Sequence, residues 1–583
     1  MFNSYYQEEL AFLRDLGREF AAANPAVAHM LEGGGADPDV ERLLQGFAFL
    51  TGRIRQKLDD EIPELYQSLM LLLWPHYLRP IPSTAVVEFQ PALEQVSQIT
   101  AVPVGTEIES VPVDGTPCRF QTCYQVELAP LTIASAEIER PLTAPPRLRL
   151  RITTSGRTPI ERLNLQRLRL FLSGEMVSAA GLLCHLLHDA THVEVSTAGG
   201  QRRERLPASS IRAVGFARDE SMLPYPNHSF VGYRLLQEYF TCPQKFLFVD
   251  FTGLGCLASL AATDSFELTI PFRRPVDDAI RVGADSFKLH CSPVVNLFRH
   301  SADGLRVDHA RAQYRLRPST VGSLPEHYEI YSVDQVVGIV QGEAKRREYP
   351  PLQAFRRVGD DGAVYYTQRL VEAVVGEGTD TYLSFVNTEQ RHVVPPTETI
   401  TVALTCTNRG LPSRLKVGDI RVPGATTPEF VRFRNITPVT RAFPPPLGRG
   451  LQWRLVSHLS LNYLSLASVE ALRGILELYN FQAFSDRQAA RTNALRLEGI
   501  IEIRATPAER VWRGTVQRGT RIELTLDEDR FAGEGDLFLF ASVLNEFFSL
   551  YATINSYSQL TVRGKQRGEV YAWPPRIGQQ IIL

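Results

Sequence analysis

The spacing of apolar residues changes at Pro80-Ile81-Pro82, and this change constrains the fold more than any other feature of the sequence. Before it, apolar residues recur every three or four positions, which is the period of an amphipathic helix. After it, short runs rich in Val, Ile, Thr and Phe are bounded by Pro and Gly, as β-strands usually are. The pattern predicts an N-terminal helical region, residues 1–80, followed by a β-rich body.

The first predicted helix carries a single apolar seam whose spacing alternates between three and four residues. Its members are Tyr6, Leu10, Leu13, Gly17 and Phe20. Phe2, Phe12 and Leu16 lie off this seam, so the apolar arc is wider than one packing stripe requires. The seam either forms the core of a helical bundle or receives a helix from a partner, and Gly17 would allow close approach. We expect it to be an interface.

Two more helices are expected before residue 80. The longer one spans 37–60, begins at Asp37-Pro38 and carries a wide apolar stripe. The stripe consists of Val40, Leu44, Phe47, Ile54 and Leu58, with Leu43, Phe49 and Leu50 beside it. A short helix then begins at Ile62-Pro63 and ends at Trp74-Pro75, because proline is typical of the first turn and of the residues after a helix.

The body is expected to contain two β-rich units with helical insertions, residues 81–325 and 326–445. Proline-rich residues Ala442–Gly450 are the expected linker to a C-terminal unit, 446–583. A helix is expected near Glu175–Leu187. The string Gly232–Phe240 is expected to be a buried helix. Predicted strands are Ala85–Phe89, Arg119–Leu128, Arg147–Thr153, Arg167–Leu172, Lys245–Phe251, Ser265–Phe272, Glu329–Val333, Thr381–Val386 and Thr399–Thr405.

The predicted order of elements in the C-terminal unit is α-β-β-α-β, which favours helices packed on one face of a sheet. Its elements are a helix at Val469–Tyr479, strands at Leu497–Ala505 and Arg521–Leu526, a helix at Leu537–Tyr551 and a strand at Gln559–Arg563. The second helix is apolar on more than one side. It is therefore either enclosed in the core of its own chain or shared with another subunit. The predicted fold class is multidomain α+β.

Charge and composition exclude several classes of protein. The 62 Lys and Arg balance 64 Asp and Glu, whereas a protein built to bind nucleic acid needs a basic surplus. The N-terminus resembles no secretory signal, and no apolar run approaches the ~20 residues of a membrane span. Seven cysteines without a CxxC motif favour free thiols in a reducing compartment. We expect a cytoplasmic protein without direct membrane insertion.

Two motifs suggest chemistry, and neither is convincing. Gly253-Leu254-Gly255 with Ala258 resembles a dinucleotide fingerprint, but the next strand follows too soon for a crossover helix, so a turn is expected. His185, His188 and His192 have a spacing that a metal site on a helix could use. Because the helix should end near Leu187, we expect solvated or helix-capping histidines. A metal- or cofactor-binding, hydrolase-like enzyme that uses these histidines is the alternative function.

Several strings together resemble one family, the TssF baseplate subunits of type VI secretion systems, also called VasA or ImpG. They run in family order from residue 4 to about 557, so chance does not explain them. The strings are SYYQEELAFLRDLGREF, DPDVERLLQGFAFLTGRIRQKLDDEIPEL, WPHYLRPIPS, GYRLLQEYF, SPVVNLF, TNRGLP, SHLSLNYLSL and FASVLNEFFSLYATINSY.

This resemblance implies a structural protein without enzymatic activity, cofactor or small-molecule substrate. Two TssF copies would assemble with one TssG, and the wedge would include TssE and TssK and surround the VgrG hub. The baseplate would dock on the inner face of the inner membrane through the membrane complex and start sheath polymerisation. The seam from Tyr6 to Phe20 would contact TssG or the second TssF copy.

Overall fold

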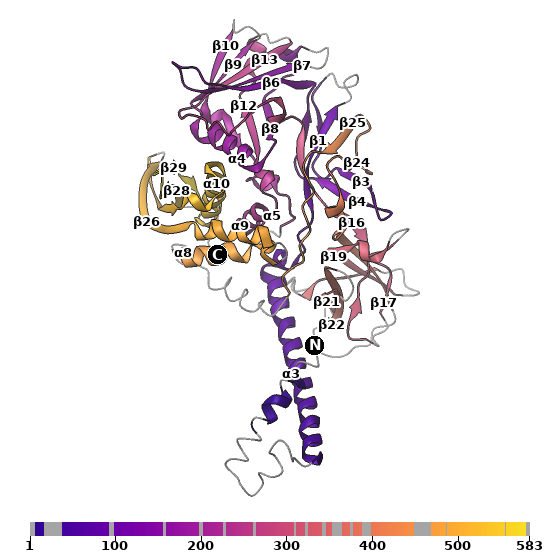
Figure 1. Cartoon of the computed structure of the whole chain (residues 1–583). Coiled ribbons are helices and arrows are strands. Elements are labelled where there is room, and N and C mark those ends of the chain that lie inside the picture. The colour runs from indigo at the N-terminus through magenta and orange to yellow at the C-terminus, as the bar shows by residue number, and fades with distance from the viewer. Residues whose placement is uncertain are drawn as a thin grey trace.

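The computed structural model shows a body of β-sheets and helices from which one long helix projects (Figure 1). The structure describes residues 6–16 apart from 8 and 15, 38–91, 98–154, 159–197, 202–225, 229–260, 264–307, 311–320, 324–340, 346–352, 364–373, 377–387, 398–447, 468–484, 487–512, 514–553 and 556–578. Its sheets and helices together confirm the multidomain α+β class.

The projecting helix α3 is continuous from Pro38 to Leu73. Its 36 residues correspond to a length of about 54 Å at 1.5 Å per residue. The prediction that a new helix begins at Ile62-Pro63 is therefore wrong. Proline in a helix interior removes one backbone hydrogen bond, at roughly 3 kcal/mol, but the Leu, Gln, Lys and Glu residues around it favour helix strongly enough to continue it. A short 3-10 turn, η1 (Pro75–Leu78), then leads into the body.

The body begins with a six-stranded sheet in the order β24-β3-β4-β15-β1-β25. Its strands are β1 (Thr84–Pro91), β3 (Glu107–Val113), β4 (Thr116–Thr122), β15 (Cys291–Val295), β24 (Ile420–Pro423) and β25 (Val431–Asn435). The strand predicted at Ala85–Phe89 is confirmed. The run predicted as one strand at Arg119–Leu128 is divided, because β4 ends at Thr122 and β5 (Val126–Leu128) pairs instead with β2 (Thr100–Val102).

Two further sheets form the part of the body drawn farthest from α3 in Figure 1. One has the order β10-β9-β13-β7-β6 and the other β11-β12-β8-β14. Their strands are β6 (Leu131–Glu139), β7 (Arg147–Thr154), β8 (Arg167–Leu172), β9 (His192–Thr197), β10 (Arg203–Pro207), β11 (Ile211–Ala213), β12 (Phe248–Thr252), β13 (Ser265–Pro271) and β14 (Phe287–Lys288).

Two of the predicted features in this region are helices. Helix α4 (Met176–Cys184) continues as a π-helical turn, η3 (His185–Asp189), close to the expected range. Helix α5 (Gly232–Thr241) is buried at every position, which confirms that this string is a fold element. The Gly253 motif is a turn, as predicted, with a positive φ of 84° at the glycine.

A second β-rich unit carries its own core of aromatic and aliphatic side chains. One sheet has the order β16-β23-β19-β20 and a smaller one β18-β22-β21, with β17 paired to β23. The strands are β16 (Phe298–Ser301), β17 (Leu305–Val307), β18 (Tyr314–Arg315), β19 (Glu329–Val340), β20 (Arg346–Tyr349), β21 (Val364–Glu372), β22 (Thr379–Asn387) and β23 (Glu398–Thr407). The three strands predicted here lie within β19, β22 and β23.

The chain then returns to the first unit, because β24 and β25 complete the sheet of β1. Phe443 is buried and pairs with Ile81 by backbone hydrogen bonds of 2.7 and 2.9 Å. The first part of the expected linker Ala442–Gly450 is thus anchored to the body, and residues 448–450 lie outside the described residues. The division at 80, 325 and 445 stays a prediction.

The described part of the C-terminal unit contains one helix more than predicted. Helix α9 occupies the start of the strand expected at Leu497, because residues 487–498 combine good helix formers without the alternation of a strand. The elements are α8 (Val469–Leu478), α9 (Arg487–Glu498), β26 (Ile500–Trp512), β27 (Thr515–Leu526), α10 (Glu534–Tyr551), β28 (Ser556–Gly564), β29 (Val570–Ala572) and β30 (Arg576–Ile577). Parallel pairing of β27 with β28 places α10 in the crossover.

Candidate functional site

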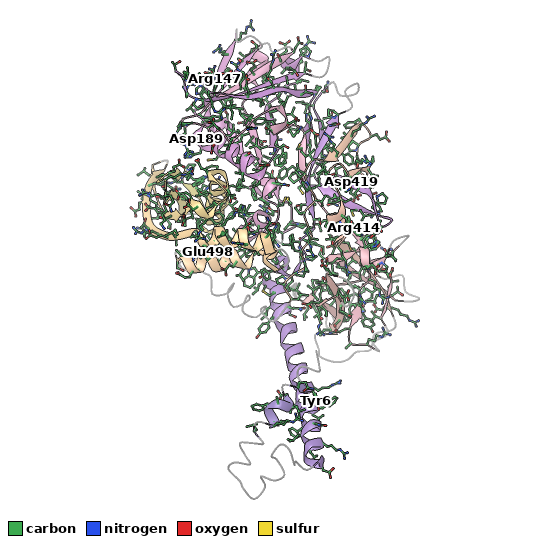
Figure 2. The ribbon with its side chains drawn as sticks, in the orientation of Figure 1. Tyr6, Arg147, Asp189, Arg414, Asp419 and Glu498 are labelled. Atoms are coloured by element: carbon green, nitrogen blue, oxygen red, sulfur yellow. The ribbon has the colours of Figure 1, made fainter. Side chains whose placement is uncertain are left out.

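The long helix α3 and the N-terminal helical segment beside it form the arm of the molecule (Figures 1 and 2). Of the predicted interface residues, Tyr6 and Leu13 are half-buried and Leu10 is only 5% exposed. Gly17 and Phe20 lie outside the described residues. The described part of the seam therefore faces inward, toward the arm itself.

The covered face of α3 is made of small residues. Ala48 is completely buried and Gly52, one turn further on, is buried too, although α3 projects from the body. Small side chains one turn apart allow a second helix to approach closely. Phe47, a member of the predicted apolar stripe, does not lie on this covered face and is 62% exposed. The spacing of Ala48 and Gly52 was the signal that sequence reasoning missed.

The opposite face of α3 exposes bulky apolar side chains. Leu43, Phe47 and Leu50, here called the outer face, are 73%, 62% and 61% exposed. Spacings of four and three residues place them within about 60° of one another around the helix, while Ala48 lies more than 90° away. An apolar cluster of this kind on a projecting element is typical of a surface that another protein covers.

The root of the arm is held by polar and apolar contacts. The side chain of Gln67 donates to the carbonyl of Leu370 at 2.9 Å and accepts from its N–H at 3.1 Å. The Gln67 side chain thereby pairs with the backbone N–H and carbonyl of Leu370 in β21, as a neighbouring strand would. Met70, one turn further on, is completely buried in the main core. Both contacts set the direction in which α3 leaves the body.

An aromatic cluster joins the residues after α3 to the C-terminal unit. The Nε2 atom of His76 lies 3.1 Å from the hydroxyl of Tyr479 and 3.2 Å from that of Tyr225. The ring of Tyr479 stacks on Tyr233 at 4.9 Å, and the hydroxyl of Tyr233 lies 3.0 Å from that of Tyr551. Burial raises the pKa of Tyr479 well above its usual value, so the cluster is a network of neutral hydroxyls.

A fully buried ion pair fixes helix α5. The Lys245 ammonium donates to the Glu238 carboxylate, and neither side chain has any exposed surface. Arg234, one turn before Glu238, adds a second cation, and Met222 and Leu223 donate backbone N–H groups. Although burial opposes ionisation, Lys245 and Arg234 lower the pKa of Glu238. Removing one partner would leave an uncompensated buried charge, which makes this helix a rigid part of the body.

The three histidines proposed as an alternative site do not converge. His185 is buried and lies 2.7 Å from Asp189, whose carboxylate also accepts two bonds from Arg274 at 2.8 and 2.9 Å. His188 packs on Tyr571, and burial lowers its pKa. His192 is on β9. The expectation of a solvated histidine is therefore wrong for His185, because it is 5% exposed and is enclosed by Asp189, four residues further on, and by the ring of Phe272.

Arg274 extends this network to the C-terminal unit. Its guanidinium contacts Glu534, at the start of α10, at 2.5 Å and Glu569 at 2.9 Å. Burial would raise the pKa of Asp189, but bonds from His185 and Arg274 lower it to about 2. Nowhere in the described part of the chain do three or more His, Cys, Asp or Glu side chains form a group that could hold a metal ion. The network joins two units of the fold.

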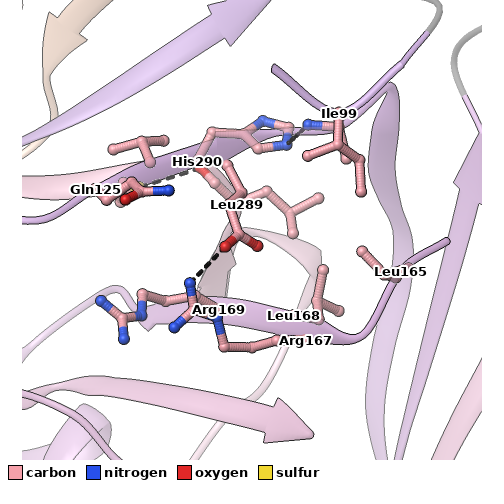
Figure 3. Close-up of a pocket in the computed structure, with 12 residues that line it drawn as sticks. Ile99, Gln125, Leu165, Arg167, Leu168, Arg169, Leu289 and His290 are labelled. Atoms are coloured by element: carbon pink, nitrogen blue, oxygen red, sulfur yellow. Dashed lines mark hydrogen bonds and ion pairs between the residues drawn. The ribbon is translucent and has the colours of Figure 1, made fainter. Parts of the chain in front are cut away.

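A small cavity near the first sheets has a volume of about 30 Å³. Figure 3 shows His290 on one side of it and Arg167 and Arg169 on the other. The ring of His290 accepts the N–H of Ala129 at 3.1 Å, and burial lowers its pKa to about 4. A cavity of this size holds about one water molecule, whereas small-molecule sites usually measure about 300–1,000 Å³.

No helix among the described residues combines the length and the apolar content that crossing a membrane requires. The arm exposes the bulky apolar side chains of the outer face. Inside the body, in contrast, enclosed charged groups form ion pairs, such as Lys245 with Glu238 and Arg274 with Asp189. This arrangement suits a protein whose contacts are made by a projecting helix.

Comparisons with known proteins agree with this geometry. A family model for the type VI secretion system protein TssF matches residues 1–580. Type VI secretion system component TssF1 of Pseudomonas aeruginosa is 32% identical, with 99% of this chain and 98% of that protein covered.

Solved structures give the same result. A chain of the TssK-TssF-TssG baseplate subcomplex, determined by cryo-electron microscopy, is 32% identical and matches 93% of this chain and 99% of its own length with a TM-score of 0.74. A chain of the type VI secretion system baseplate complex is 29% identical over the full length of both, with a TM-score of 0.59. The chain therefore belongs to the TssF family of type VI secretion system baseplate components.

Proposed function

We propose that this protein is a structural wedge subunit that joins its partners through the arm. The outer face carries the proposal, because Leu43, Phe47 and Leu50 are more than half exposed on a helix that leaves the body. Burying such a side chain completely is worth roughly 1.5–3 kcal/mol. Three neighbouring side chains therefore supply a substantial part of the free energy of a protein–protein interface.

The related structures support two of the proposed partners. One relative was solved together with TssK and TssG, which supports both as partners of this chain. The proposal also includes TssE, a second TssF copy and the VgrG hub. In this arrangement two copies of the chain bind one TssG. The assembled wedge docks at the inner face of the inner membrane from the cytoplasmic side and starts polymerisation of the sheath.

The body acts as a rigid base for the arm. Gln67 fixes the root of α3 to β21, and the cluster around His76 fixes the following residues to α8 and α10. A rigid root matters because a helix that is already oriented loses less conformational freedom on binding. In this proposal the protein positions and binds its partners, and it performs no catalytic step.

Coexpression of this chain with TssG and TssK from the same source, followed by native mass spectrometry, tests the proposal. We expect a complex that contains two copies of the chain for each TssG. Its dissociation should leave a folded body rather than an unfolded chain. Recovery of this chain alone, with TssG and TssK found only with each other, would show that it is not a wedge subunit.

A further inference from the structure

The second β-rich unit is inserted between strands of the first sheet, so the chain crosses between the two units twice. It enters after β15 through Asn296 and returns after β23 through Asn408. Both asparagines are fully buried. The Nδ2 of Asn296 donates to the Oδ1 of Asn408 at 2.8 Å, and the N–H of Asn408 donates to the Oδ1 of Asn296 at 2.7 Å. We call this pair the asparagine clasp.

The asparagine clasp is also bonded to the first sheet. The backbone of Arg119 in β4 donates to the Oδ1 of Asn408 at 3.0 Å and accepts from the Nδ2 of Asn296 at 2.6 Å. The N–H of Asn296 donates to the carbonyl of Ser83, immediately before β1, at 2.9 Å. Buried hydrogen-bond networks of this kind make the backbone that they join rigid. The asparagine clasp therefore fixes the orientation of the second β-rich unit on the first sheet.

The second β-rich unit also holds the root of α3, because β21 lies beside this helix (Figure 1). Among the described side chains of α3 after residue 65, only those of Gln67 and Met70 are buried. Gln67 pairs with the backbone of Leu370, and the Leu370 side chain belongs to the same core as Met70.

The contact between α3 and the second β-rich unit is not close-packed throughout. A pocket of about 230 Å³ lies between them, and its walls include Leu71 and Leu72 of α3 and Ile330 and Tyr366 of the second unit. Side chains that border a pocket have fewer packing partners than those of a filled core. The two hydrogen bonds of Gln67 therefore carry much of the contact on this side of α3.

The end of α3 does not by itself hold so long a helix in one direction. Helix α3 ends at Leu73, and Trp74 has non-helical dihedral angles, φ −137° and ψ 62°, before η1 begins. One residue of non-helical backbone thus joins the two elements. A rotation of about 10° about Met70 would move Pro38, which is ~48 Å away along the helix, by ~8 Å. A contact on a second side of α3 prevents such a rotation.

We propose that the second β-rich unit sets the direction of the arm. The asparagine clasp fixes this unit to the first sheet, and Gln67 transfers its orientation to α3 through β21. The connection is continuous, because β21 pairs with β22, Thr379 in β22 donates to Glu329 in β19 at 2.8 Å, and β19 pairs with β23. Strand β23 ends one residue before Asn408. Gln67 and Asn408 are therefore positioning residues for the arm.

The distance distribution between two spin labels on the full-length chain tests this proposal. The labels are attached at Arg53→Cys on α3 and Arg491→Cys on α9, both exposed positions. Cys256→Ser removes the one native cysteine that is not buried. We expect a single narrow distribution for this labelled parent. Gln67→Leu preserves the size of the side chain and removes both bonds to Leu370, so it should broaden the distribution roughly twofold.

Asn408→Ala removes side-chain bonds of the asparagine clasp and should broaden the distribution in the same way, although Asn408 bonds to residues of the body. Asn408→Ser replaces it if the alanine variant does not fold. Asn435→Ala is the matched control, because Asn435 is equally buried and bonded to backbone groups but lies in β25. Its distribution should equal that of the labelled parent. Each variant is measured well below its own melting temperature, so that global unfolding does not contribute.

The outcomes separate the proposal from simpler accounts. A narrow distribution for Gln67→Leu would overturn it, because Met70 and η1 would then be sufficient to hold the arm. Broadening by Gln67→Leu without broadening by the Asn408 variant would also overturn it, because the asparagine clasp would not affect the arm. Equal broadening by Asn435→Ala and the Asn408 variant would mean a general loosening of the body, which contradicts a specific role for the second β-rich unit.

Discussion

Helices α10 and α3 are both apolar on more than one side, yet the apolar side chains of α10 are buried and several of those of α3 are exposed. Phe540, Leu544 and Phe547 of α10 are at most 1% exposed. Leu43 and Phe47 of α3 are 73% and 62% exposed. Helix α10 lies in the crossover between β27 and β28 and packs against α4 and α5, whereas α3 leaves the body (Figure 1).

The difference shows that apolar composition measures how much surface must be buried and does not identify what buries it. For α10 the covering elements come from the same chain, which decides between the two alternatives that its sequence allows. Gly535 permits this, because a Cβ there would lie 2.2 Å from the backbone of Ala180 in α4. For the outer face of α3 the described residues provide no such cover.

The largest expected effect is loss of a core aromatic from α10. Phe547 has no exposed surface and contacts the rings of Phe230 and Tyr551. Phe547→Ala should lower the free energy of unfolding by about 3–5 kcal/mol, because it removes a large apolar side chain and leaves a cavity. Thermal unfolding of the isolated chain measures it, with Phe47→Ala on the arm as the matched control. The control should stay within about 0.5 kcal/mol. Equal losses for both would remove the distinction between the helices.

A second prediction concerns the pH dependence of the body. Burial lowers the pKa of His290 to about 4, from an ordinary value of 6.5. Because the folded state binds the proton less readily, the neutral ring contributes stability above pH 6.5, and this contribution falls as pH drops toward 4. Since the ring is only half-buried, we expect a loss of about 2 kcal/mol.

His290→Asn tests this dependence, because asparagine tolerates the positive φ of 54° at this position. Between pH 7 and pH 4 the variant should lose less stability than the unchanged chain. Denaturant unfolding at several pH values measures the difference. Parallel pH profiles for both proteins would mean that another group causes the dependence.

A smaller effect is expected for the buried histidine at the end of α4. His185→Ala removes the bond to Asp189 and the ring that packs on Phe272, and Asp189 keeps Arg274. We expect a loss of about 1–2 kcal/mol in thermal unfolding. His192→Ala, on β9, should change stability by less than about 0.5 kcal/mol. A loss for His192→Ala as large as that for His185→Ala would contradict the structure.

Sequence periodicity predicted the elements that local spacing determines. The strands at Arg147–Thr153 and Arg167–Leu172 and the buried helix at Gly232–Phe240 agree with the structure, because alternation and helical spacing are properties of neighbouring residues. The continuity of α3 was not predictable from Pro63, since a proline signals a helix start more often than an interior position.

The candidate site was predictable only in part. The sequence indicates that the N-terminal helices carry more apolar surface than they can cover, but not which face stays open. That choice depends on Ala48 and Gly52, whose burial is a tertiary property. The network around His185 was also hidden, because Asp189 is held by Arg274 and Arg274 contacts Glu534, more than 250 residues further along the chain.

We propose that the outer face of α3 binds a partner while the body folds without it. The most direct measurement is copurification of tagged TssG with a chain that carries Leu43→Asp and Phe47→Asp. Leu142→Asp is the control, because Leu142 is fully exposed in the turn between β6 and β7. Burying two unpaired carboxylates should cost several kcal/mol, on the order of 2–4, and reduce recovery with TssG at least tenfold. The melting temperature should stay unchanged, and the control should copurify normally. Recovery of the double variant with TssG at the stoichiometry of the unchanged chain would contradict the account.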